Sequence, residues 1–177
     1  MTATVTLRSS IEQRLLARSL ERAVAKLDVT ALSSKRVTVD LVALTNDQAF
    51  AKSYVAALLK RRGVLVVDDP GSAELKLQVF ASALGVDQGQ TLIGIPQTVV
   101  PLLGLPIPEI ALFKWVRHRG ISEIALYAYD SRDGRLIEAA PTGFGQAKYD
   151  QFTILLVIGF GSSDLEERPP PFEGRAN

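Results

Sequence analysis

The sequence predicts an α/β (α+β) domain with a single mixed sheet of about five to six strands and two helices packed on one face. Three observations favour this class. Apolar residues recur at helical spacing over residues 10–27. A β-branched strand and a second helix follow over residues 37–62, and a strictly alternating segment covers residues 73–84. The 177 residues suit one domain, expected over residues 8–162, with a disordered tail over 163–177.

The first helix is expected over residues 10–27. Ser9 and Ser10 are suitable helix caps, and Glu12 adds a carboxylate to the first turn. The apolar positions at helical spacing are Leu15, Leu16, Leu20, Val24 and Leu27.

The second helix is expected to begin at Asp47, after a cap at Thr45 or Asn46, and to end at Arg62. Gly63 then takes the position of a left-handed C-cap. The side of this helix expected to face the core comprises Phe50, Tyr54, Ala57 and Leu58. The strand before it covers Val37 to Leu44.

A short strand over residues 64–67 ends at Asp68-Asp-Pro-Gly71, whose residues suit a turn. The alternation over residues 73–84 then predicts a strand with one solvent-facing side. Residues 85–108 interrupt the pattern, because four prolines stand among apolar residues. This segment is predicted to be an irregular apolar loop.

Strand character returns at residues 109–116, breaks at residues 117–120 and resumes over residues 121–129. Asp130-Ser-Arg-Asp-Gly134 is a hairpin turn signal, with a returning strand over residues 135–140. Residues 152–160 are almost wholly apolar and are predicted to form the last strand, in the centre of the sheet.

The composition excludes several classes of function. Lys and Arg number 20 against 19 Asp and Glu, which removes the electrostatic argument for nucleic-acid binding. The absence of cysteine excludes disulfides and thiolate sites. Residues 2–7 lack the pattern of a signal peptide, and no apolar run reaches the roughly 18 residues of a membrane-spanning helix.

No constellation of catalytic, cofactor-binding or metal-ligating residues is evident. The single histidine, His118, has no second ligand at metal-site spacing and is expected to be a surface turn residue. The acidic pairs Asp68/Asp69 and Asp130/Asp133 suit turns. We therefore predict a non-enzymatic protein with no cofactor.

Two glycine pairs also fail as phosphate sites. Gly143-Phe-Gly145 and Gly159-Phe-Gly161 both lack the residues that complete a phosphate-binding loop, and neither opens a convincing helix.

Two passages resemble the α/β domain shared by the N-terminal part of TolB and the curli-secretion lipoprotein CsgG. They are the turn and alternating strand over residues 71–79 and the hairpin IALYAYDSRDGRLIEAA over residues 124–140.

More closely, the chain resembles a family of bacterial lipoproteins known only as a domain of unknown function. The matching segments are Ile11–Leu16, Ala83–Asp87, Leu92–Pro96 and Pro108–Lys114, so the likeness covers most of residues 8–160. It implies a place in the bacterial cell envelope, on the periplasmic face of the outer membrane. Such lipoproteins begin with a signal sequence and a lipidated cysteine, and we expect the present chain to be a trimmed form.

The apolar loop is the candidate site. Each of its large side chains would contribute about 1.5–3 kcal/mol if fully buried, so exposure is costly unless something covers it. The loop either completes the domain's own core or contacts a protein partner, a second copy or a membrane surface through residues 92–113. The residues predicted to make this contact are Leu92, Ile93, Ile95, Val99, Val100, Leu102, Leu103, Leu105 and Ile107.

An alternative is a small-ligand or carbohydrate-binding periplasmic module. In that case Trp115, Tyr127, Tyr129 and Phe144 would gather their rings in one pocket.

Overall fold

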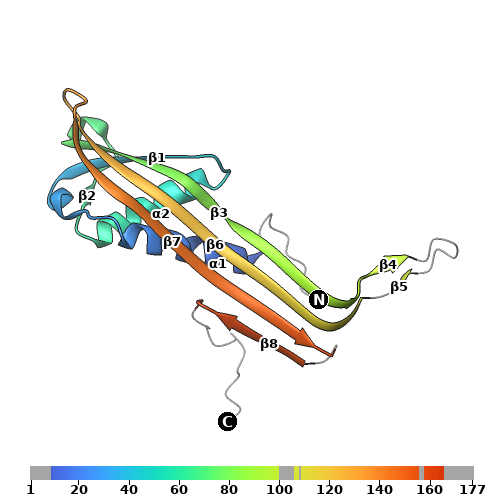
Figure 1. Cartoon of the computed structure of the whole chain (residues 1–177). Helices are drawn as coiled ribbons and strands as arrows, with labels where there is room; N and C mark the ends of the chain where they lie inside the picture. Colours follow the sequence, from blue (N-terminus) through green and yellow to red (C-terminus); the bar gives the residue numbers. More distant parts are fainter. Residues whose placement is uncertain (1–8, 100–105, 108, 156–157, 166–177) are drawn as a thin grey trace, which may run out of the picture. The chain divides into compact units, whose positions relative to one another are not determined.

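The computed structural model describes residues 9–99, 106–107, 109–155 and 158–165 (Figure 1). Its regular elements, in chain order, are α1 (Ser10–Ala25), β1 (Arg36–Ala43), α2 (Gln48–Arg61), β2 (Leu65–Val66), β3 (Leu75–Ile95), β4 (Thr98–Val99), β5 (Pro106–Ile107), β6 (Ile110–Asp130), β7 (Leu136–Ile154) and β8 (Ile158–Ser163). Short 3-10 turns stand at Thr30–Leu32 and Pro70–Ser72.

One mixed sheet contains six of the described strands, in the order β2-β1-β3-β6-β7-β8. β1 is parallel to both β2 and β3, and β7 is antiparallel to β8. A hydrogen bond from the Ser131 N–H to the Glu74 carbonyl places the end of β6 beside the start of β3, which makes that pair antiparallel. The predicted single mixed sheet with two helices is confirmed. β4 and β5 form a separate two-stranded sheet.

The chain divides into two compact units, where the sequence suggested one domain over residues 8–162. Unit 1 comprises residues 1–87 and 119–147, and unit 2 comprises residues 88–118 and 148–177. The long strands β3, β6 and β7 each contribute residues to both units.

α1 begins where the sequence predicts. The Ser9 hydroxyl accepts a hydrogen bond from the Glu12 N–H (3.3 Å), and the Glu12 carboxylate accepts one from the Ser9 N–H (3.1 Å). This reciprocal capping box satisfies two of the free N–H groups of the first turn. The helix ends at Ala25 rather than at Leu27, although Leu27 is still buried.

α2 is confirmed, but its predicted buried side is partly wrong. Phe50 is 47% exposed and Ala57 is exposed, whereas Leu58 is buried as expected. The helix instead buries Ala51, Val55 and Leu59. Apolar residues occur around most of this helix, so spacing alone admits two sides, and packing selects one of them. Gly63 follows with φ +86°, as predicted for the C-cap.

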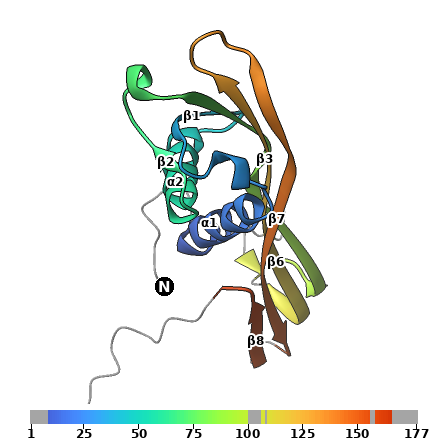
Figure 2. The ribbon, with the colours of Figure 1, turned by 90° about the vertical axis from the view of Figure 1, so that its left-hand side faces the viewer.

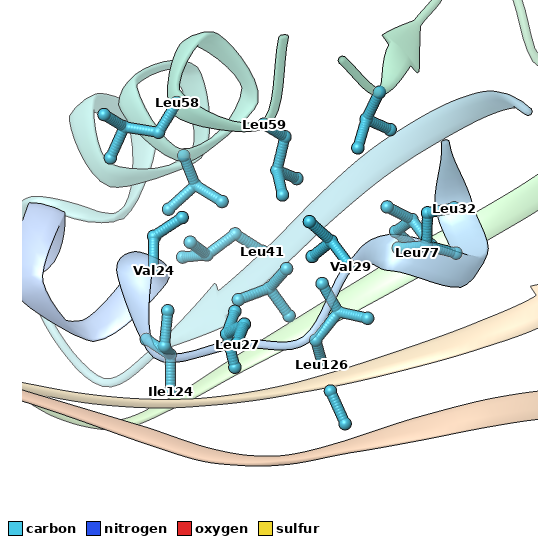
Figure 3. Packing of buried hydrophobic residues seen from close by; sticks show 14 of the residues in the cluster. Val24, Leu27, Val29, Leu32, Leu41, Leu58, Leu59, Leu77, Ile124 and Leu126 are labelled. Carbon is cyan, nitrogen blue, oxygen red and sulfur yellow. The ribbon is translucent and has the colours of Figure 1, made fainter. Parts of the chain in front are cut away.

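The hydrophobic core lies in unit 1, between the two helices and one face of the sheet (Figure 2). Figure 3 shows how its side chains pack together, with Val24 in the last turn of α1, Leu27 just after α1, and Leu59 on α2. Leu41, Leu77, Ile124 and Leu126 come from the strands. These side chains are no more than 1% exposed. The alternation over β3 therefore predicted the buried face correctly, since Leu75, Leu77, Val79 and Ala81 are all buried.

α1 lies directly against the backbone of β6 and β7. A Cβ at Gly120, Gly143 or Gly145 would overlap a carbonyl oxygen of the helix, that of Leu15, Ala23 or Ser19 respectively. Glycine is thus required at three positions by the close approach of two backbones.

Beside these glycines, the buried hydroxyls of Ser19 and Ser122 lie 2.7 Å apart, and the Ser19 hydroxyl donates to the Leu16 carbonyl (2.9 Å). Both polar side chains are therefore satisfied in the interior. The sequence Gly143-Phe-Gly145 does not fit a phosphate-binding loop. In the structure its two glycines allow α1 to approach the backbone of β7.

Three strand predictions are wrong in their extent. The loop predicted over residues 85–108 begins only after Ile95, because no proline precedes Pro96 and β3 continues through residues 85–95. The break predicted at residues 117–120 is absent, and β6 runs unbroken from Ile110 to Asp130. Residues 117–120 stay in strand conformation because β6 pairs with β3 on one side and with β7 on the other, and this pairing outweighs their low intrinsic strand propensity.

The strand predicted at the centre over residues 152–160 is divided. Its first part ends β7, and its second part begins β8, the last strand in the order of the sheet. A run of apolar residues is typical of a strand buried on both faces, yet Ile158 and Phe160 are more than half exposed. Residues 166–177 of the predicted tail lie outside the described residues.

Glu21 of α1 accepts a hydrogen bond from α2 and makes an ion pair within its own helix. The Tyr54 hydroxyl donates to the Glu21 carboxylate, which also pairs with Arg18 (3.0 Å). Burial would raise the pKa of Glu21, but the hydrogen bonds from Tyr54 and Arg18 outweigh it and hold that pKa below its ordinary value. Burial and the hydrogen bond to Glu21 raise the pKa of Tyr54 to about 12.

We predict that Gly145→Ala destabilises the protein by about 1–3 kcal/mol, because the added methyl forces α1 away from β7. Gly85→Ala is the matched control, since a Cβ there meets no atom within 4 Å. The midpoint of urea unfolding followed by circular dichroism measures both. Equal midpoints for the two variants would contradict the close approach of α1.

We predict that Tyr54→Phe weakens the pH dependence of stability. The folded pKa of Glu21 lies below its ordinary 4.5, so its contribution is present above pH 4.5 and is lost as the pH falls through the folded pKa. The folded pKa of Tyr54 lies above its ordinary 10, so its contribution is present below pH 10 and is lost as the pH rises through about 12. Urea midpoints from pH 3 to pH 11 should fall less at both extremes in the variant; parallel profiles would contradict this.

Candidate interaction surface

The residues predicted from the sequence to make contact are distributed over several short elements. Leu92, Ile93 and Ile95 end β3, Val99 lies in β4, and Ile107 lies in β5. Val100, Leu102, Leu103 and Leu105 lie outside the described residues, as does the side chain of Ile107.

The described members of this set are largely exposed. Ile93 is 59% exposed, Ile95 50% and Val99 55%, while Leu92 is partly buried. On the neighbouring part of β6, Leu112 is 54% exposed. Apolar side chains of this size gather on a protein surface mainly where something else binds. The apolar tip, as we call Ile93, Ile95, Val99, Ile110 and Leu112, is the candidate surface.

The described part of unit 2 has almost no interior. Every member of the hydrophobic core cluster belongs to unit 1. Among the described residues of unit 2, only Ala111 and Asp150 are buried. The exposed aliphatic side chains that the structure describes in unit 2 therefore do not border a buried core.

An aromatic row crosses three strands of unit 2. Phe113 and Trp115 on β6 contact Phe152 on β7, with ring centroids 6.4 Å and 5.7 Å apart. Phe152 in turn stacks on Phe160 of β8 at 5.1 Å, and these two residues are partners in the strand register. The Arg117 guanidinium lies 4.9 Å from the centroid of the Trp115 ring. The row is a ladder of cross-strand pairs, which stabilise a sheet in the absence of a deep core.

Asp150 fixes the position of the tryptophan. Its carboxylate, in a residue only 7% exposed, accepts a hydrogen bond from the Trp115 indole N–H (2.9 Å). A buried carboxylate needs such donors, and a buried indole N–H needs an acceptor. The pair therefore locks β6 to β7 within unit 2.

The aromatic pocket considered from the sequence does not form in the described contacts. Tyr127 makes an edge contact with Phe80, and Phe144 lies under the Lys26 ammonium. Trp115 uses its ring surface on Phe152 and Arg117. The four residues proposed to gather thus have different neighbours, and no described ring contact joins Tyr129 to them.

The acidic and histidine residues considered as possible site residues take part in turns and in strand packing instead. Asp69 accepts a hydrogen bond from the Gly71 N–H (3.0 Å), and Asp130 accepts one from the Arg132 N–H (2.8 Å), so both turns are as predicted. His118 lies within β6 and packs on Tyr149, which corrects its predicted place in a turn. No group of three acidic, cysteine or histidine residues that could hold a metal occurs in the part of the chain that the structure describes.

A hollow of about 500 Å³ lies in unit 1 between the start of β3 and the hairpin that follows β6. Glu74, one of the two acidic residues that line it, pairs with both Arg36 (3.4 Å) and Lys35 (3.6 Å). The backbone hydrogen bond from Arg36 is the main reason that the pKa of Glu74 is lowered. These cations are thus engaged by a carboxylate of their own chain.

No protein-family model and no curated protein matches this chain. Within the described residues, neither helix combines the length and the apolar character needed to cross a membrane.

The single tryptophan gives unit 2 a specific probe, since both helices belong to unit 1. We predict that Trp115 fluorescence changes at a lower urea concentration than the helical circular dichroism signal, because unit 2 lacks a described core and opens first. Coincident transitions would indicate that the two units unfold as one.

Proposed function

We propose that this chain is a non-enzymatic assembly or partner-binding module, which contacts a protein partner or further copies of itself through residues 92–113. The observation that carries the proposal is the exposure of the apolar tip in a unit without a described core. Burying one such side chain contributes about 1.5–3 kcal/mol, so covering several of them would support a stable contact.

The non-enzymatic part of the proposal is supported by the use of the acidic side chains. Glu12 caps a helix, Glu21 and Glu74 join elements, Asp150 holds an indole, and Asp69 and Asp130 shape turns. These six carboxylates thus have structural roles in capping, joining elements and shaping turns.

We further propose a TolB- or CsgG-like arrangement and a place in the bacterial cell envelope, at the periplasmic face of the outer membrane. The support for the fold is the succession of α1, β1, α2, β2 and β3 with both helices on one face of the sheet. The location rests on the resemblance described above. Fractionation of cells that make the full-length protein tests it, and recovery in the cytosolic fraction would contradict it.

We predict that Ile95→Lys abolishes the association made through the apolar tip, because a charge at the centre of a contact must be desolvated. Leu136→Lys is the matched control, since both side chains are 50% exposed and Leu136 belongs to unit 1. Solution mass by light scattering measures self-association, and crosslinking in the source cell measures a different partner. Both variants should keep the free energy of unfolding of the native chain to within about 0.5 kcal/mol.

Two outcomes would contradict the proposed contact. One is an unchanged mass and crosslinking pattern in Ile95→Lys. The other is an equal loss in Leu136→Lys, which would indicate a general effect of added charge. Binding to anionic lipid vesicles without any protein contact would assign the apolar tip to a membrane surface instead.

A further inference from the structure

The outer edge of β8 has no described partner. β8 is the last strand in the order of the sheet, and its other edge pairs with β7. The Asp164 N–H donates to the Lys148 carbonyl (3.0 Å). By the alternation of an antiparallel ladder, the N–H and C=O groups of Gly159, Gly161 and Ser163 then point away from β7. Such a row of outward groups can pair with another strand.

The edges of unit 1 are protected, whereas no described residue protects this edge of β8. β2 is only two residues long, and the part of β7 in unit 1 contains Pro141. Farther along that strand, the Arg22 guanidinium donates to the Gln146 carbonyl and so occupies an edge acceptor. A short strand, a proline and a cation are the usual means of blocking an edge. β8 (IGFGSS) contains neither a charge nor a proline.

The fold of one chain leaves room for a side chain at Gly159 of β8 but little at Gly161. A Cβ at Gly159 would meet only the Phe152 carbonyl oxygen, at an ordinary 3.7 Å, whereas one at Gly161 would lie 3.3 Å from the Asp150 carbonyl oxygen, which is a tight contact with backbone. By contrast, the fold itself forbids a side chain at Gly120, Gly143 and Gly145. Glycine in an exposed strand allows another backbone to approach closely.

The aromatic row also ends at this edge. Phe160 stacks on Phe152 on its inner side and is 52% exposed. Ile158, two residues away on the same face of β8, is 58% exposed. A second β8 strand placed alongside would continue the row, since directly opposed side chains lie about 4.5–5.5 Å apart.

We infer that two copies of this chain pair through β8, antiparallel about a two-fold axis, with Phe160 facing Phe160 of the partner subunit. Gly159 then exchanges both backbone hydrogen bonds with Gly161 of the partner subunit, and Gly161 does so with the partner's Gly159. The two sheets become one, and the aromatic row runs through the axis. A self-complementary edge of this kind suits the two-fold dimer, the commonest symmetric assembly.

This inference rests on the proposed assembly role and names a second copy as the partner, at an edge separate from residues 92–113. Residues 88–95 of β3 have a second edge without a described strand partner, because the pairing with β1 ends at Ala81. However, Gly94 is explained within the chain by the Ile110 carbonyl together with a φ of +149°, and a Cβ at Gly89 would displace the Arg117 side chain. No short contact of either kind stands at Gly159, so the glycine argument favours β8.

Cysteine crosslinking tests the pairing directly, because the chain contains no cysteine. In the inferred register the two Phe160 positions form a non-hydrogen-bonded pair, with Cα atoms about 4.5 Å apart, within the range of a disulfide. Phe160→Cys should form covalent dimers on mild oxidation. Leu136→Cys, a comparably exposed position in unit 1, should remain monomeric. Equal crosslinking of the two variants would overturn the inference.

A second variant preserves Phe160. The inferred register places Ile158 opposite Ser162 of the partner subunit, so the double variant Ile158→Cys/Ser162→Cys should crosslink at least several-fold more than either single variant. In a mixture of Phe160→Cys and Ile93→Cys chains, disulfides that form only between the two different variants would overturn the two-fold pair. They would indicate that β8 of one copy pairs with β3 of another.

Gly159→Pro separates this inference from the proposed function. It removes one outward N–H and no hydrogen bond to β7, so the dimer should fall to monomer mass while the helical circular dichroism is unchanged. Self-association that is lost in Ile95→Lys but unaffected by Gly159→Pro would overturn the β8 pairing and leave the apolar tip as the contact. A native chain that is monomeric, forms no disulfide through Phe160→Cys and crosslinks to nothing in the cell would overturn both.

Discussion

The close approach of α1 to the sheet is the contact on which the rest of unit 1 depends. A helix normally stands off a sheet by the length of its side chains, but here three glycines on β6 and β7 bring the helix carbonyls against the strand backbone. The core therefore shifts to one side of α1, where Leu20, Val24 and Leu27 meet the side chains of β1, β3 and α2. The buried serine pair satisfies the hydroxyls that this arrangement leaves in the interior.

The division between a packed unit and an unpacked one follows from the same strands. β3 and β6 carry buried side chains at alternate positions within unit 1, and over the described residues of unit 2 that burial almost disappears. In place of a core, unit 2 relies on cross-strand aromatic pairs and on the bond between Trp115 and Asp150. Such a surface is suited to binding, because little of its apolar area is used within the chain.

Periodicity was sufficient to predict most elements of unit 1, although β7 continues to Ile154, beyond the strand predicted over residues 135–140. The capped first helix, the alternating strand and the hairpin at Asp130 all carry local signals that the structure follows. It failed where long-range contacts decide. The buried side of α2 depends on what α2 packs against, and the strand through His118 is held by its neighbours. The glycines beneath α1 were missed because a required absence of side chain has no periodic pattern. For the candidate surface, the sequence identified the apolar residues around Ile93 and Ile95, but not the aromatic row, whose members are distant in the chain.

The bond from Arg22 to the Gln146 carbonyl has a consequence for how the molecule fails under stress. While α1 is in place, this guanidinium occupies a backbone hydrogen-bond acceptor on an edge of β7 that has no described strand partner there. Loss of the helix would release that edge together with a strip of bare glycine backbone beneath it. Heat or acid that detaches the N-terminal segment would then expose an unpaired strand edge in unit 1, which gives the packed unit its own route to irreversible precipitation.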